Sequence, residues 1–244
     1  MRRRHLLTSA AVTGVLAVSG CLSILDRDET HDHTFQTTTG ELEHPENHET
    51  VGDDAFSVFV NSVRENRAYG STGIWGQAEA RPDDTIPLVG AITSMRQHVN
   101  DVTAHHTLAL FRLDEDGDSD RAHHQLWCWS GYDVTEADDD LTRISIELSA
   151  EHPHVSLGIY SPWSNREAGE EYRVGHAGQS AMFPLPEGEI GPDHDAIRIG
   201  PGGNVRIDWM GHESERLGIA MCCEAYWRPA GDYDIDLTVS GTFA

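Results

Sequence analysis

The sequence predicts a mainly β protein, an antiparallel β-sandwich or jelly-roll-like domain that carries one short helix. Short apolar runs follow one another along the chain, and turn residues rich in Gly, Pro and Asp separate them roughly every 8 to 15 residues. The chain shows no internal repeat and no alternation of strands with helices, which argues against a dinucleotide-binding fold.

Most of the expected strands show apolar and polar residues in alternation. Ile144, Ile146 and Leu148 are typical, because every second residue of a strand faces the same side of its sheet. We expect strands over 67–80, 107–113, 124–134, 141–148, 155–160, 182–185, 196–199, 205–209, 218–227 and 233–243. The segment 55–63 is open to either strand or helix. The acidic turn at 114–120 predicts a hairpin, and the runs 218–227 and 233–243 are expected to form the last strand pair.

One segment favours a helix, and one favours little regular structure. Ile92, Met95, Val99 and Val102 recur at helical spacing, which predicts a short helix over 91–101. Residues 161–178 are polar and contain glycine, so they are expected to be the least structured part of the domain.

The first 21 residues have the order of an export signal. Arg2, Arg3 and Arg4 precede an apolar run over 6–18, which is shorter than the roughly 20 residues that a membrane span needs. A small residue then precedes Cys21. The segment resembles a lipoprotein signal, and Arg3 and Arg4 resemble the paired arginines of the twin-arginine export signal. The resemblance implies lipidation at Cys21 and an anchor on the outer face of the membrane.

Three regions follow from this arrangement. Residues 1–21 form the export signal with its lipobox, and residues 22–52, rich in Asp, Glu, Thr and His, are expected to form an acidic disordered tether. Residues 53–244 then form a single β-sandwich-like domain, long enough to bury a core.

The chain is strongly acidic and contains no lysine. It has 41 Asp and Glu residues against 17 Lys and Arg residues, a net charge of −24, and all basic residues are arginines. This balance argues against nucleic-acid binding, which needs a basic patch. Carboxylates spread over every segment resemble a halophilic surface, and together with the export signal the chain resembles a haloarchaeal surface lipoprotein.

The four cysteines leave an odd number once Cys21 carries lipid. Cys223 belongs to the more apolar face of the strand expected over 218–227, whereas Cys222 shares a face with Glu224. A disulfide between Cys128 and Cys223 is therefore one interpretation, and three buried unpaired thiols are the other.

Fifteen histidines, several of them in close pairs, raise the question of a metal site. If the 107–113 strand pairs back symmetrically about Gly117, His106 lies opposite Cys128. The candidate ligands are His105, His106, His123 and His124. The alternative is that histidine supplies polar surface in a chain without lysine. We predict no cofactor.

No reaction motif supports an enzyme. His212 and Glu213 are followed three residues later by Arg216, so the zinc-protease pattern His-Glu-x-x-His is missing. Among six tryptophans, Trp163 in the polar 161–178 segment is the one expected to be exposed, where it suits stacking on a sugar or a protein.

The leading hypothesis is a lipid-anchored cell-surface lipoprotein that acts as a non-enzymatic structural or interaction module with a protein or glycan partner. A metal- or carbohydrate-binding module and an extracellular hydrolase with an unrecognised site remain the alternatives.

Overall fold

A computed structural model describes residues 29–43, 80–81, 88–93, 97–99, 101–113, 121–175, 180–185, 187–228 and 231–244. The described chain is almost entirely β and its sheets are antiparallel, as the sequence predicts. In this part of the chain no helix is long and apolar enough to span a membrane. Cys21, Arg3 and Arg4 lie outside the described residues, as do the acidic turn at 114–120 and the segment 55–63.

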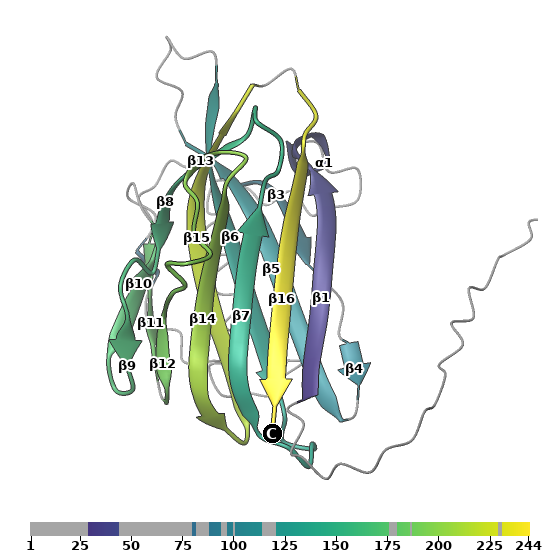
Figure 1. The fold of residues 1–244 in the computed structure, drawn as a ribbon, viewed down its shortest axis with the longest axis vertical. Helices are drawn as coiled ribbons and strands as arrows, with labels where there is room; N and C mark the ends of the chain where they lie inside the picture. Colours follow the sequence, from purple (N-terminus) through teal and green to yellow (C-terminus); the bar gives the residue numbers. More distant parts are fainter. Residues whose placement is uncertain are drawn as a thin grey trace, which may run out of the picture.

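Two large sheets pack face to face as a sandwich (Figure 1). The six-stranded sheet has the order β1 (Glu29–Thr38), β16 (Asp234–Phe243), β7 (Leu141–Ser149), β14 (Asn204–Glu213), β12 (Glu189–Pro192) and β9 (Arg166–Glu167). The seven-stranded sheet has the order β13 (Gly200–Pro201), β8 (Ser156–Ser161), β15 (Arg216–Trp227), β6 (Ala122–Asp133), β5 (Val102–Arg112) and β3 (Leu88–Thr93), and β4 (Gln97–Val99) also pairs with β5.

A third, three-stranded sheet lies at the side of the sandwich. It consists of β10 (Glu171–Val174), β11 (Ser180–Pro184) and β2 (Ala80–Arg81). Its Tyr172 is buried, and the Tyr172 hydroxyl accepts a hydrogen bond from the backbone N–H of Ala220 in β15 at 3.2 Å. This contact ties the small sheet to a central strand of the large one.

The core lies between the two large sheets. In β14 the inward residues Val205, Ile207 and Trp209 are fully buried, and they alternate with more exposed polar residues, as expected for a sheet with one face in solvent. The rings of Tyr132 in β6 and Phe243 in β16 meet edge to face, 5.8 Å apart, where the sheets touch. Each fully buried large side chain contributes about 1.5–3 kcal/mol.

The central strands β6 and β15 are buried along nearly their whole length. Trp127 and Cys222, which face away from the inter-sheet core, are as inaccessible as Cys128 and Cys223, which face into it. The apolar runs 126–129 of β6 and 219–223 of β15 reflect this burial on both faces.

The helix predicted over 91–101 is wrong. Of its described residues, 91–93 belong to β3 and 97–99 to β4, which both pair with β5, and Asp101 lies in a turn. Residues four apart, such as Met95 and Val99, lie on one face of a helix but also on one face of a strand, so their spacing does not separate the two structures. Pairing with β5 decides in favour of strands. The described helix is α1 (Thr39–Glu43), in a segment where no helix was expected.

The disordered tether predicted over 22–52 does not hold for residues 29–43, so the domain begins before residue 53. β1 pairs with β16 along its whole length. The N–H of Thr39 donates to the carbonyl of Tyr233 at 2.8 Å, and the N–H of Tyr233 donates back to the Thr39 hydroxyl at 3.1 Å. Leu42 is fully buried. The composition misleads because β1 is an edge strand with exposed polar residues such as Asp32 and Gln36.

Three other expectations need correction. The runs 218–227 and 233–243 do not pair with each other, because β15 and β16 belong to different sheets and the chain between them crosses the sandwich. Residues 196–199 form no strand apart from a bridge at Arg198, whereas 200–201 form β13. The polar segment 161–178 contains both β9 and β10.

Candidate functional site

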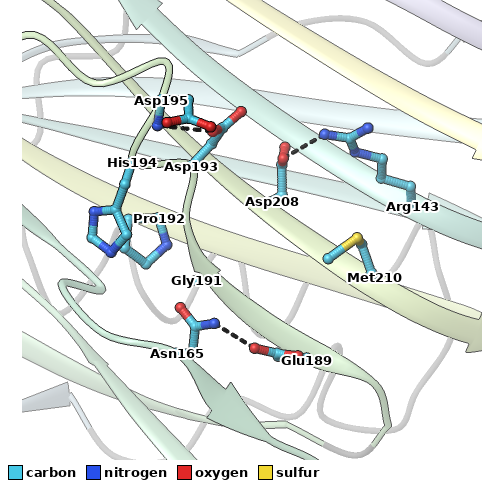
Figure 2. A pocket seen from close by; sticks show the side chains of 10 residues that line it. All are labelled: Arg143, Asn165, Glu189, Gly191, Pro192, Asp193, His194, Asp195, Asp208 and Met210. Atoms are coloured by element: carbon cyan, nitrogen blue, oxygen red, sulfur yellow. Dashed lines mark hydrogen bonds and ion pairs between the residues drawn. The ribbon is translucent and has the colours of Figure 1, made fainter.

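The outer face of the six-stranded sheet carries a groove with a volume of about 420 Å³. Side chains from β7, β12 and β14 line it, together with the turn after β12 and the residue before β9 (Figure 2). The lining residues are Arg143, Asn165, Glu189, Gly191, Pro192, Asp193, His194, Asp195, Asp208 and Met210. Its volume falls within the range of small-molecule binding sites in proteins.

The strand registers explain why the surface is hollow here. Asp208 in the middle of β14 lies opposite Ser145 of β7 on one side and Gly191 of β12 on the other. On the next outward row, Met210 lies between Arg143 and Glu189. Two small residues flanking Asp208, beside a row of longer side chains, leave a trough along the sheet.

One end of the groove is closed by Asn165. A Cβ atom on Gly191 would lie 2.2 Å from the Asn165 side-chain oxygen, so the amide rests directly on this glycine. The Asn165 side-chain nitrogen also donates a hydrogen bond to Glu189. Figure 2 shows this pair at one end of the groove and the Asp193–Asp195 turn at the other. Replacing Gly191 by any larger residue would displace Asn165.

Two arginines hold the central carboxylate. Arg143 donates to Asp208 at 2.5 Å, and Arg206 donates to the other Asp208 oxygen at 3.1 Å. Arg206 also lies 3.7 Å from Asp193 and 3.8 Å from Glu147. Charge-assisted hydrogen bonds of this kind orient the side chains of the groove before any ligand arrives.

Two exposed apolar side chains are associated with the groove, one in its lining and one close to it in the sequence. Met210 is 54% exposed, which is unusual for a large apolar side chain in a strand. Trp163 is 67% exposed and lies two residues before Asn165, whereas Trp127, Trp129, Trp209 and Trp227 are buried. The expectation that Trp163 is the exposed tryptophan is confirmed for the described residues.

The histidine candidates are not brought together. His106 lies inside the sandwich, where its Nδ1 is 2.8 Å from the Ser130 hydroxyl. His123 and His124 point to opposite faces of β6: His123 stacks on Tyr226 and His124 on Trp227, with ring centroids 4.3 and 4.0 Å apart. His105 belongs to β5, and its side chain is not described.

The predicted pairing of His106 with Cys128 is wrong by two residues. Cys128 lies opposite Leu108, and His106 lies opposite Ser130. A shift of two keeps every side chain on its expected face, so the apolar pattern cannot distinguish these registers. Among the residues that the structure describes, no group of three or more His, Cys, Asp or Glu side chains is placed to hold a metal ion.

A half-buried polar cluster surrounds Glu224. The Tyr226 hydroxyl donates to the Glu224 carboxylate at 2.7 Å, and the His123 Nε2 lies 3.3 Å from the same oxygen. Burial, followed by the contact with Glu224, raises the pKa of Tyr226. Gly158 makes room for this cluster, because a Cβ there would lie 2.8 Å from the Tyr226 ring.

The cysteines are buried thiols. Cys128, Cys222 and Cys223 are free in the structure, so the disulfide considered between Cys128 and Cys223 is not formed in it. Burial raises the pKa of each thiol, that of Cys223 to about 12. Such thiols are poor nucleophiles and poor metal ligands.

Comparison with known proteins adds no name to this site. No protein-family model matches the chain, and no curated protein matches it. The groove residues were not identified from the sequence. Arg206, Asp208 and Met210 alternate with apolar residues in the sequence, which indicates that they share the outward face of a strand. Nothing in the sequence indicates that β12 and Asn165 lie beside this face.

Proposed function

We propose that the protein is a lipid-anchored cell-surface module that binds a partner, without catalysing a reaction, through the groove on the outer face of its six-stranded sheet. The observation that carries this proposal is the groove itself. Its hydrogen-bonding groups are held by one another, exposed Met210 is part of its lining, and exposed Trp163 lies two residues before the lining residue Asn165. Preformed polar groups beside exposed apolar side chains are typical of recognition surfaces.

The other polar clusters support a binding role over a catalytic one. Ser130 and His106 form a hydrogen-bonded pair of a kind found in hydrolases, but both are inaccessible, at 0% and 1% exposure. A nucleophile must meet its substrate. Within the groove, the central carboxylate of Asp208 is neutralised by two arginines, which suits positioning more than proton transfer.

The anchor is tested by fractionating cells. Changing Cys21→Ser should move the protein from the membrane to the medium, and changing both Arg3 and Arg4 to Lys should keep it inside the cell. If neither variant changed the distribution of the protein between membrane, medium and cell interior, the proposed export signal and lipid anchor would be contradicted.

The binding role is tested with secreted protein that carries Cys21→Ser. We expect it to bind saturably to envelopes from cells that lack the gene. The double variant Asn165→Ala, Glu189→Gln should bind at least tenfold more weakly, since each lost hydrogen bond costs about 1 kcal/mol. Glu136→Gln, at an exposed position in the turn after β6, is the matched control. Equal binding by the groove variant and wild type would exclude the groove as the binding face.

A further inference from the structure

The groove offers hydrogen-bond donors and acceptors side by side. Arg143 contacts Asp208 and still leaves 40% of its side chain exposed, and Asn165 is also an exposed residue. The carboxylates of Glu189 and Asp193 lie near them, on β12 and at its end. A ligand group that both donates and accepts hydrogen bonds is satisfied by such a surface, and a hydroxyl group is the simplest one.

The charges of the groove repel an anion and leave a cation no unpaired carboxylate at the centre. Four carboxylates face one lining arginine, in a chain with a net charge of −24, so an anion is repelled. A cation is attracted by the net negative charge, but it meets the guanidinium of Arg143, and the carboxylate at the centre of the groove is already paired with Arg143 and Arg206. A neutral ligand with many hydroxyl groups avoids both problems, and its hydrogen bonds are not screened by salt.

The exposed side chains of Met210 and Trp163 suit the same ligand class. Consecutive Cα atoms are 3.8 Å apart, so the Cα atoms of Trp163 and Asn165 are separated by at most about 7.6 Å. An exposed indole within this distance can lie against the C–H face of a sugar ring, while its neighbours bind the hydroxyl groups. Met210 provides a second apolar contact inside the groove.

We propose that the groove binds a neutral carbohydrate chain, with Arg143, Asn165 and Glu189 contacting its hydroxyl groups and Trp163 stacking on a ring. This inference rests on the proposed function, because it names the partner of the same face. It states that the partner of the cell-surface module is a glycan and not a protein.

The test uses the secreted protein with Cys21→Ser on an array of neutral oligosaccharides of hexose and N-acetylhexosamine, in about 2 M NaCl so that charge interactions are screened. We expect binding to at least one of these glycans. Titration calorimetry should show affinity lowered about fivefold by Asn165→Ala and by Trp163→Ala. Ile199→Ala and Glu136→Gln change exposed side chains outside the groove lining and should leave the affinity within twofold. Thermal unfolding of each variant verifies that it is folded.

The outcomes separate the two proposals. The carbohydrate inference is overturned if no glycan binds, or if binding is unchanged in both Asn165→Ala and Trp163→Ala. If envelope binding nevertheless depends on the groove and survives periodate oxidation of glycans, the partner is a protein and only the carbohydrate inference fails. If envelope binding does not depend on the groove, the proposed function fails as well.

Discussion

At the scale of single residues, the groove depends on glycines that allow close approach. Gly188, just before β12, has a φ of 77°, and a Cβ there would lie 2.3 Å from the carbonyl oxygen of Met210. Gly169 has a similar φ of 85°, but a Cβ there would meet no atom within 4 Å. A side chain at either glycine would therefore strain the backbone, but only a side chain at Gly188 would also clash with neighbouring atoms.

This contrast gives a first prediction. Gly169→Ala should lower the free energy of unfolding by about 1 kcal/mol, the cost of a left-handed residue with a side chain. Gly188→Ala should cost at least about 2 kcal/mol more, because β12 must move away from β14. Urea denaturation measures both. Equal costs would mean that the close approach of β12 and β14 does not exist.

His124 provides a second prediction, for pH. Burial, and then the nearby Arg112 guanidinium, lower the pKa of His124 from 6.5 to about 3 in the folded protein. Below pH 6.5 the unfolded chain binds a proton that the folded chain does not. The stability from this residue is therefore complete above pH 6.5 and is lost as pH falls toward 3.

The expected loss between pH 7 and pH 5 is about 2 kcal/mol, and His124→Gln should remove it. The measurement is the free energy of unfolding of both proteins at the two pH values. The difference in pH dependence between the two proteins gives the contribution of His124 alone, because the titrating carboxylates are the same in both. An identical pH dependence in both would contradict the depressed pKa.

At the scale of elements, β1 and α1 decide where the domain begins. Thr39 is fully buried and exchanges hydrogen bonds with Tyr233, and the N–H of Gly40 donates to the Asp232 side chain at 3.0 Å. These contacts hold the segment after β1 on the loop that precedes β16. The segment is therefore part of the fold.

A third prediction concerns this segment. A chain that starts at residue 29 should keep the melting temperature of one that starts at residue 22. A chain that starts at residue 44 should melt at a clearly lower temperature and associate, because the edge of β16 becomes unpaired. Thr39→Val should cost about 1–2 kcal/mol in the full chain, and the exposed Thr34→Val less than about 0.5. If all three chains melted at the same temperature, residues 29–43 would not stabilise the domain, which would support a disordered tether in this segment.

The strands differ in how well the sequence predicts them. Long strands such as β5, β6, β7, β15 and β16 follow from runs of apolar or alternating residues. β12 has four residues and β9 two, and both lie in segments whose letters show little apolar pattern. β12 pairs with β14, and β9 pairs with β12, so neither pairing follows from the local sequence and the groove that they form was not predicted.

Edge strands and register were the other difficult points. The face of each residue in β6 was predictable, but its partner in β5 was not, since a shift of two residues buries the same side chains. β1 was missed because an edge strand with one polar face has the composition of a linker.

At the scale of the whole molecule, the net charge of −24 predicts a stability that depends on salt. The Debye length falls from about 10 Å at 0.1 M salt to about 3 Å at 1 M, so repulsion among the carboxylates should fall with added salt. We expect the melting temperature to rise steadily between 0.1 M and 2 M NaCl, as measured by circular dichroism. A constant or falling melting temperature would contradict the halophilic interpretation.

The position of the first described strand determines which end of the sandwich would lie near a lipid anchor. β1 begins beside the C-terminal end of β16, at one end of the molecule (Figure 1). Seven residues separate Cys21 from Glu29, and a chain of this length spans at most about 25 Å. If Cys21 carries lipid, this end of the sandwich faces the membrane, and the side of the six-stranded sheet that bears the groove stays open to the surroundings.

The most direct test of the binding face is photo-crosslinking in living cells. A photoreactive amino acid replaces Met210 in the groove or, as the matched control, Ile199 outside the groove lining; the two native side chains are 54% and 53% exposed. We predict a discrete crosslinked product from position 210 and none from position 199. Products of equal yield at both positions, or a product from position 199 alone, would show that the partner does not bind in the groove.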